Sequence, residues 1–144
     1  MKLGAEVKSR NASWSNWAGN QRIEQASLYM PKTEDELQQI VSYARANNMR
    51  IKAVGSGHSF TAIALAEEII IDLSNYDEIV AIDKDKKTVT VQSGIQLSKL
   101  NRELYKNGLA MQNLGDIAYQ TISGAIATST HGTGAKISGI AGQV

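Results

Sequence analysis

The stretch Val54-Gly55-Ser56-Gly57-His58-Ser59-Phe60 follows a short strand that is predicted over residues 50–54. Its two glycines carry no side chains, so consecutive backbone N–H groups are able to turn inward toward an anion such as a pyrophosphate. The dinucleotide fingerprint Gly-x-Gly-x-x-Gly fails because Phe60 stands at the third glycine, and no lysine follows as a P-loop requires. The spacing alone therefore leaves a tight turn between strands as an equal alternative.

A second segment of small residues, Thr121–Gly134, reads Thr-Ile-Ser-Gly-Ala-Ile-Ala-Thr-Ser-Thr-His-Gly-Thr-Gly. We expect a helix that a Thr121 cap opens and that ends at Gly132. Thr121 and the first N–H groups of such a helix are able to hold a phosphate. Taken alone, the segment favours the alternative of a buried helix in which Gly and Ala allow close packing.

The remaining pattern predicts a mixed α and β chain. Alternating or β-branched runs predict strands over residues 22–30, 50–54, 68–73, 79–82 and 88–92, the last two as a hairpin around the charged turn 83–87. A helix should follow Pro31, with Thr33 and Glu36 as a capping box and an end near Asn47-Asn48. A second helix should end at Asn107-Gly108. The apolar stripes are Leu37, Ile40, Val41 and Ala44 in the first helix and Leu97, Leu100, Leu104 and Tyr105 in the second.

The composition is that of a globular protein, with 42% hydrophobic and 20% charged residues. Fifteen Lys and Arg balance 14 Asp and Glu without forming a basic run, so nucleic acid is not an expected partner. With no cysteine and two histidines, neither a disulfide framework nor a Cys/His zinc site is expected. Residues 1–10 lack the apolar run of a secretory signal, so we expect a cytoplasmic protein, with membrane association left open.

No repeat or Pro/Gly/Ser-rich linker divides the chain, so we expect residues 1–144 to form one domain with both motifs in one unit. Residues 138–144 carry no charge and no signal of a closing helix or strand. We therefore expect a C-terminal truncation, with self-association through the apolar face and sheet edge that a cut would expose.

Four features occur in one order: Asn16-Trp17-Ala18-Gly19-Asn20, Pro31 with its capped helix, Gly55–Phe60 and Ile122–Gly134. Together they resemble the vanillyl-alcohol-oxidase-like superfamily of PCMH-type FAD-binding proteins, over residues 16–134. Within it, the chain is most similar to the alditol oxidases and to the L-gulonolactone and D-arabinono-1,4-lactone oxidase branch. The resemblance implies an α+β fold: the N-terminal portion of the PCMH-type domain, a small mixed α/β subdomain plus the start of a second, without the substrate domain.

The resemblance also implies that the first loop wraps the pyrophosphate of FAD and that His58 bonds to a ring methyl group of the flavin. A neutral imidazole is a nucleophile at neutral pH, although a phosphate hydrogen bond is the alternative role. The FAD contacts carried over are Val54, Gly55, Ser56, Gly57, His58, Ser59, Phe60, Asp116, Thr121, Gly124, Thr128 and His131. Asp116 departs from the small hydroxyl residue common in relatives and Ser129 from a glycine, which puts the Asp116 contact in doubt.

The activity that the resemblance implies is oxidation of a CH–OH group of an alditol, sugar or aldonolactone by covalent FAD, with oxygen as acceptor and hydrogen peroxide as product. The catalytic base and the polyol or lactone clamp are expected outside residues 1–144. The alternatives are a non-catalytic flavin- or nucleotide-binding module, a dehydrogenase that reduces a protein acceptor, and an inactive truncated fragment. Trp14 and Trp17 are interpreted as buried anchors, and Asp72, Asp77 and Glu78 as turn caps.

Overall fold

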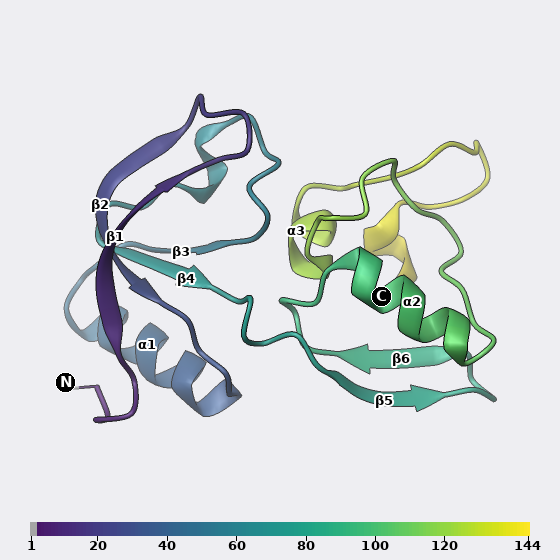
Figure 1. Cartoon of the computed structure of the whole chain (residues 1–144), viewed down its shortest axis with the longest axis horizontal. Coiled ribbons are helices and arrows are strands. Elements are labelled where there is room, and N and C mark those ends of the chain that lie inside the picture. Colours follow the sequence, from purple (N-terminus) through teal and green to yellow (C-terminus); the bar gives the residue numbers. More distant parts are fainter. Residues whose placement is uncertain (1–2) are drawn as a thin grey trace. The chain divides into compact units, whose positions relative to one another are not determined.

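The chain divides into two compact units in the computed structural model, which describes residues 3–144 (Figure 1). The first unit extends to Tyr76 and the second covers Asp77–Val144. The boundary segment, residues 73–78, contains one Ser and no Pro or Gly, so it has no linker-like composition. The two motifs lie in different units, Gly55–Phe60 in the first and Thr121–Gly134 in the second. The predicted α+β character is confirmed in both units.

A four-stranded sheet in the order β1-β2-β4-β3 forms the centre of the first unit. Its elements are β1 (Ser9–Ser15), β2 (Arg22–Tyr29), α1 (Glu34–Ala46), β3 (Ile51–Val54), the 3-10 turn η1 (Ala62–Ala64) and β4 (Ile69–Asp72). β1 is antiparallel to β2, whereas β2 and β3 both run parallel to β4. The alternation of β4 separates two cores, because Ile69 and Ile71 pack with Ile40 of α1 while Ile70 packs with Val54 on the other face. The sheet thereby fixes the end of β3, where the glycine loop begins.

The predicted capping box at the start of α1 is confirmed. The Thr33 hydroxyl accepts from the Glu36 N–H at 3.2 Å, and the Glu36 carboxylate accepts from the Thr33 N–H at 3.4 Å. The helix ends at Ala46, with Asn47 as its C-cap. Of the predicted apolar stripe, Ile40 and Ala44 are buried, whereas Val41 is 49% exposed and does not belong to the core.

Replacing Thr33 with alanine should destabilise the first unit by about 1 kcal/mol, because the Glu36 N–H loses its side-chain acceptor. Thr61→Ala is the matched control, since Thr61 precedes η1 without a side-chain cap bond. Both tryptophans, Trp14 and Trp17, lie in the first unit, so their fluorescence during urea unfolding reports on it. Equal unfolding midpoints for the two variants would contradict the role of the cap.

The second unit packs a hairpin against helix α2 (Leu97–Lys106). The hairpin strands are β5 (Ile79–Asp83) and β6 (Thr88–Val91), and the unit also contains α3 (Ile122–Ala127) and the 3-10 turn η2 (Ile140–Gln143). Leu97, Leu100 and Leu104 of α2 are buried in one cluster with Ile95, Ile122 and Ile140. The predicted hairpin and helix are confirmed, but Tyr105 is 84% exposed and lies outside the apolar stripe. On α2, the Lys106 ammonium bonded at 2.7 Å lowers the pKa of the Glu103 carboxyl.

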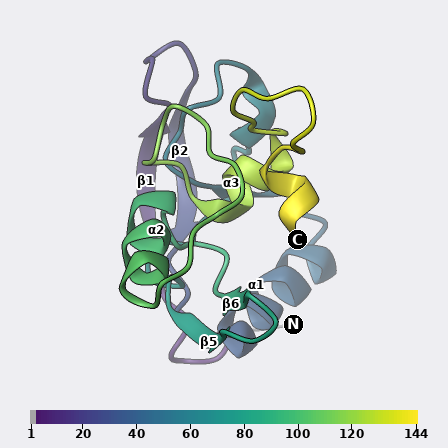
Figure 2. The same cartoon turned by 90° about the vertical axis from the view of Figure 1, so that its right-hand side faces the viewer.

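The helix predicted over Thr121–Gly134 is much shorter than expected and ends at Ala127. The Thr128 hydroxyl bonds back to the Gly124 carbonyl at 2.8 Å, and Ser129 adopts a positive φ of 54°. Both features stop helix propagation five residues before Gly132. The closing turn η2, for which no sequence signal was expected, lies beside α3 in both views of the ribbon and buries Ile140 completely (Figure 2).

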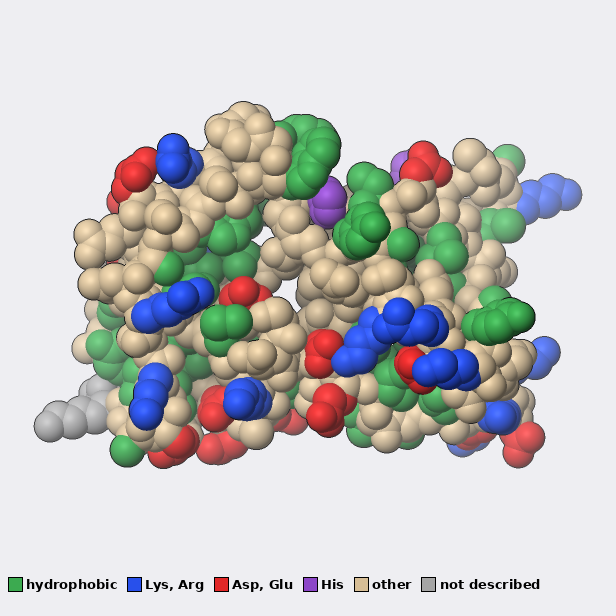
Figure 3. Space-filling model, viewed as in Figure 1, with side chains coloured by type: hydrophobic (Ala, Val, Ile, Leu, Met, Phe, Trp, Pro, Cys, Tyr) green, Lys and Arg blue, Asp and Glu red, His purple; other side chains and the backbone are tan. Residues whose placement is uncertain are grey.

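Positive and negative side chains are interspersed on the face of the molecule drawn in Figure 3, which carries no large area of one sign. Among residues 3–144, no helix is long and apolar enough to cross a membrane. Asp72 caps a turn as predicted, since its carboxylate accepts from the Ser74 N–H at 2.8 Å. Asp77 differs from that prediction, because it pairs with Lys99 of α2 at 2.7 Å.

Candidate functional site

The Gly55–Phe60 loop follows β3 and is held by a turn that joins β1 to β2, residues 16–21. Asn16 is the centre of this support and is only 4% exposed. Its side-chain N–H group donates to the Ser59 carbonyl at 2.9 Å and to the Asn20 side chain at 2.7 Å, while its oxygen accepts from the Gln21 N–H at 3.0 Å. A fully used amide of this kind fixes both segments relative to each other.

Further bonds from the same turn end on carbonyl oxygens of the loop. The side chains of Asn20 and Gln21 both donate to the Phe60 carbonyl, at 3.0 and 3.2 Å. The Trp17 N–H donates to the Gly57 carbonyl at 2.8 Å. The loop is therefore held by donors of residues 16–21 that bond to its carbonyl oxygens.

The donors of the loop are not used in the same way. Within the described part of the chain, the backbone N–H groups of Gly55, Gly57 and His58 donate to no protein acceptor. Gly57 has a φ of 72°, and a Cβ there would lie 3.3 Å from both the Asn16 Cα and the Trp17 nitrogen. A turn with a left-handed glycine and unpaired N–H groups has the character of an anion-binding nest. The loop therefore fits a phosphate or pyrophosphate group.

His58 is half-buried in this loop, and its ring lies 5.8 Å from that of Trp17 at an interplanar angle of 36°. Trp17 is 72% exposed, so the interpretation of this residue as a buried anchor is wrong. Trp14 does pack against the core that contains Ile23 and Val54. Phe60, at the end of the loop, is 61% exposed. The first unit thus presents the His58 imidazole, within a loop that fits an anion, beside the Trp17 indole.

The second predicted segment begins with the expected Thr121 cap, whose hydroxyl accepts from the Gly124 N–H at 3.3 Å. The other N–H groups of the first turn are used as well. Those of Ile122, Ser123 and Ala125 donate to the carbonyls of Ile95, Ser93 and Thr121, respectively. No N–H group of this turn is left for a phosphate, so the geometry favours the packing interpretation of α3.

A chain of polar side chains joins the residues before α3 to those after it. The Gln120 amide donates to the Thr130 hydroxyl at 3.1 Å, which lies 3.4 Å from the Thr128 hydroxyl, and Thr128 donates to the Gly124 carbonyl. The other end of the amide, Gln120 Oε1, is buried and has no partner among the described residues. A buried acceptor without a donor fits a site whose ligand supplies that donor. No sequence signal singled out Gln120.

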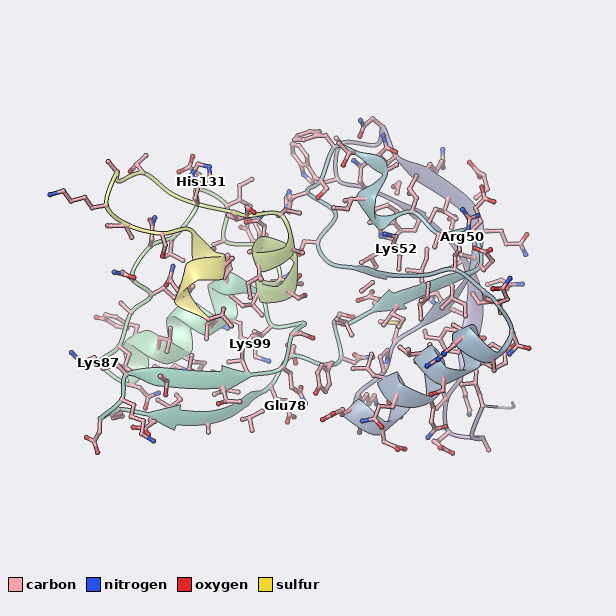
Figure 4. The ribbon with its side chains drawn as sticks, turned by 180° about the vertical axis from the view of Figure 1, so that it is seen from behind. Arg50, Lys52, Glu78, Lys87, Lys99 and His131 are labelled. Atoms are coloured by element: carbon pink, nitrogen blue, oxygen red, sulfur yellow. The ribbon has the colours of Figure 1, made fainter. Side chains whose placement is uncertain are left out.

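Two glycines allow the segment around Leu114 to approach residues 130–132. A Cβ on Gly132 would overlap the Leu114 carbonyl oxygen, and one on Gly115 would lie 2.9 Å from Thr130 Cγ2. Asp116 is exposed beside this contact. His131 lies on the loop after α3, exposed and away from the hairpin turn that carries Lys87 (Figure 4), with its Nδ1 3.0 Å from the Gly132 carbonyl.

Each unit therefore carries one group of the predicted contacts. Val54 and Gly55–Phe60 are brought together at the end of β3, and Thr121, Gly124 and Thr128 are joined by the α3 cap and its last turn. No group of three His, Asp or Glu side chains in residues 3–144 is arranged to hold a metal ion. The sequence analysis did not assign a supporting role to Asn16, Asn20 or Gln21. The signal that could have identified them is their position in or directly after the segment 16–20, which contributes to the family resemblance.

Comparison with known proteins identifies a family and several relatives. The family model described as "FAD binding domain" matches residues 26–144. The chain is 37% identical to L-gulono-1,4-lactone dehydrogenase of Mycobacterium tuberculosis (strain H37Rv) over 91% of this chain and 31% of that protein. It is 36% identical to L-gulonolactone oxidase of Mus musculus over 94% of this chain and 31% of that protein. The chain thus spans about a third of the length of these relatives.

Solved structures give the same result for the fold. A solvent-stable cholesterol oxidase superposes with a TM-score of 0.84 at 26% identity, covering 91% of this chain and 26% of that one. An alkyldihydroxyacetonephosphate synthase superposes with a TM-score of 0.67 over 77% of this chain and 22% of that one, at 24% identity.

Proposed function

Since the chain belongs to the FAD-binding domain family and has the N-terminal portion of the PCMH-type fold, we propose that it binds FAD through the Gly55–Phe60 loop. The observation that supports this most strongly is the asymmetry of the loop. Its carbonyls at Gly57, Ser59 and Phe60 are fixed by residues 16–21, while the N–H groups of Gly55, Gly57 and His58 have no protein acceptor. These donors suit the pyrophosphate of a dinucleotide.

We assign the remaining contacts as the resemblance implies. In the first unit Val54, Ser56, His58, Ser59 and Phe60 accompany the two loop glycines. In the second unit Asp116, Thr128 and His131 are assigned as contacts, while Thr121 and Gly124 support them by shaping the first turn of α3. Gln120 joins this group because its buried oxygen has no donor among the described residues and is free to accept a hydrogen bond from a ligand.

His58 is proposed to carry the flavin covalently. The bond would join an imidazole nitrogen to the ring methyl carbon in place of one N–H and one C–H bond, leaving a flavin reduced by two electrons and two protons, which oxygen would reoxidise. What supports the assignment is placement: His58 is the histidine of the anion-binding loop, half-buried and flanked by Trp17. Attachment at this point orients the ring relative to the protein.

In a protein as long as its relatives, this chain would be the FAD-binding part of an oxidoreductase that acts on a CH–OH group. When bound, FAD supplies a hydride acceptor. The substrate is an alditol, a sugar or an aldonolactone such as L-gulonolactone or D-arabinono-1,4-lactone, and oxygen reoxidises the flavin. The names of the relatives support this class, since they include an L-gulonolactone oxidase and a putative D-arabinono-1,4-lactone oxidase of Neurospora crassa. The residues of this chain bind and orient the cofactor in that reaction.

A second candidate is a dehydrogenase that passes electrons to an acceptor other than oxygen. It is favoured by relatives named dehydrogenase, from Mycobacterium tuberculosis and from plant mitochondria. The oxidase and the dehydrogenase are distinguished by reducing the flavin of the FAD-loaded chain chemically and then admitting air. Return of the yellow colour within seconds supports the oxidase, and a flavin that stays reduced until an artificial dye is added supports the dehydrogenase.

The loop is tested by FAD titration of the flavin-free chain, comparing Gly57→Ala with Gly108→Ala. Both glycines have a φ of 72°, so both substitutions cost about 1 kcal/mol of backbone strain. A Cβ on Gly108 meets open space, whereas one on Gly57 presses on the Asn16–Trp17 backbone and displaces the loop donors. We expect Gly57→Ala to weaken FAD binding about tenfold or more and Gly108→Ala to leave it unchanged. Equal affinities for the two variants would contradict the assignment.

A further inference from the structure

The backbone of Trp17 is bonded to the Gly55–Phe60 loop, but its side chain is exposed. Its N–H donates to the Gly57 carbonyl at 2.8 Å, and its neighbour Asn16 is buried with every polar side-chain atom bonded. The main chain at this position is therefore fixed. The indole nonetheless remains 72% exposed.

Such exposure has a cost, because an indole is among the largest apolar surfaces that a side chain offers to water. The other tryptophan is better protected from water: Trp14, three positions earlier, is half-buried and packs against the core beside β3. Among residues 3–144, Trp17 belongs to no buried cluster, and the ring recorded next to it is that of His58, at 5.8 Å. The indole thus lies beside the imidazole, on a main chain held by hydrogen bonds, with its surface available to a ligand.

We propose that Trp17 is a flavin-contacting residue, whose indole packs against the planar ring system of FAD. The proposal rests on the function proposed above, in which the loop N–H groups take the pyrophosphate and His58 takes the flavin ring. An uncharged aromatic side chain suits the ring system and not the phosphates. Aromatic rings attract one another at centroid separations of about 4.5–7 Å, and the neighbour of Trp17 at such a distance is the side chain to which the flavin is assigned.

The experiment compares the binding of FAD and of ADP to the flavin-free 144-residue chain by calorimetry, within minutes of mixing so that reversible binding is measured. ADP has the adenosine and pyrophosphate of FAD and lacks the flavin. We expect Trp17→Leu to weaken FAD binding about tenfold and to leave ADP binding unchanged, since stacking on an aromatic side chain contributes about this much. Trp17→Phe should restore most of the loss, and the control Trp14→Phe should bind FAD like the parent.

The fluorescence of bound FAD gives a readout independent of affinity. An indole in contact with the flavin quenches its emission, so FAD bound to Trp17→Leu at saturation should be brighter than FAD bound to the parent or to Trp14→Phe. Unchanged FAD affinity and emission in Trp17→Leu would overturn the proposal. Equal losses of FAD and ADP binding would also overturn it, since they would assign Trp17 to support of the loop. A parent chain that binds neither ligand would instead refute the proposed function itself.

Discussion

A chain carrying His58→Ala is expected to release all of its flavin when it is precipitated with acid, whereas the parent keeps the yellow colour in the pellet. The reason is that the chain has two histidines, and His58 is the one within the loop whose N–H groups at Gly55, Gly57 and His58 have no protein acceptor. Substitution removes the nucleophile while the support from residues 16–21 ends on other loop atoms. The measurement is the flavin absorbance of the washed pellet, which should be lost completely in His58→Ala.

The matched control for this experiment is His131→Ala. His131 is an exposed histidine beside a glycine, on the loop after α3 in the second unit. Its side chain contacts the Gly132 carbonyl at 3.0 Å, so its removal changes little in the fold. We expect the His131→Ala pellet to be as yellow as that of the parent once both have been saturated with FAD, because loss of a non-covalent contact leaves the bond to His58 in place. Flavin retained by His58→Ala and lost from His131→Ala would move the attachment to the second unit.

The second large effect is expected at Gly132, where alanine should destabilise the second unit by about 3 kcal/mol. A Cβ there overlaps the carbonyl oxygen of Leu114, and backbone cannot yield as the end of a flexible side chain can. The contact between residues 113–115 and residues 130–132 would have to open. Amide hydrogen exchange measures this directly: protection in α2 and α3 should fall, while α1 and β4 keep their rates.

Gly108→Ala is the control for Gly132→Ala because it lies in the same unit, at the end of α2, in open space. It carries a backbone strain of about 1 kcal/mol from its positive φ, without any steric overlap. Protection of α2 and α3 should therefore fall much less. If Gly132→Ala exchanges no faster than Gly108→Ala, the close approach at Leu114 does not determine the stability of this unit.

The elements that the sequence predicted well are those with local causes. The capping box at Thr33 needs only Glu36, three residues away, and the hairpin needs only the charged turn between its two strands. The family resemblance predicted the PCMH-type FAD-binding fold, which the family match over residues 26–144 and the TM-score of 0.84 confirm. Strand β1 was not predicted, because its burial pattern is mostly exposed at the edge of the sheet and its apolar signal is weak.

Errors arose where distant or small effects decide the outcome. Val41 and Tyr105 have helical spacing but lie at the borders of their stripes, so they face water. The length of α3 depends on a hydroxyl of Thr128 that competes for a helix carbonyl and on the positive φ of Ser129, neither of which a helix pattern reveals. The unit boundary after Tyr76 carries no change in composition.

The candidate site was predicted in part. The glycine loop and the Thr121 cap were recognisable from residue types, since both depend on adjacent positions. The role of Asn16 was not, because its partner Ser59 lies 43 residues along the chain. The buried oxygen of Gln120 is likewise visible only once the segment is folded. The exposure of Trp17 reversed its interpretation, because residue type alone favours burial.

The most direct measurement is the mass of the acid-denatured chain after incubation with FAD, followed by mass mapping of its proteolytic fragments. We expect a chain heavier than its 15.6 kDa polypeptide by the mass of one FAD, less the two hydrogens removed when air reoxidises the flavin that bonding has reduced, with the addition confined to the fragment that contains His58. An unmodified mass from a chain that was yellow before denaturation would contradict the covalent assignment and leave His58 as a phosphate contact. A chain that takes up no FAD at all would contradict the account as a whole.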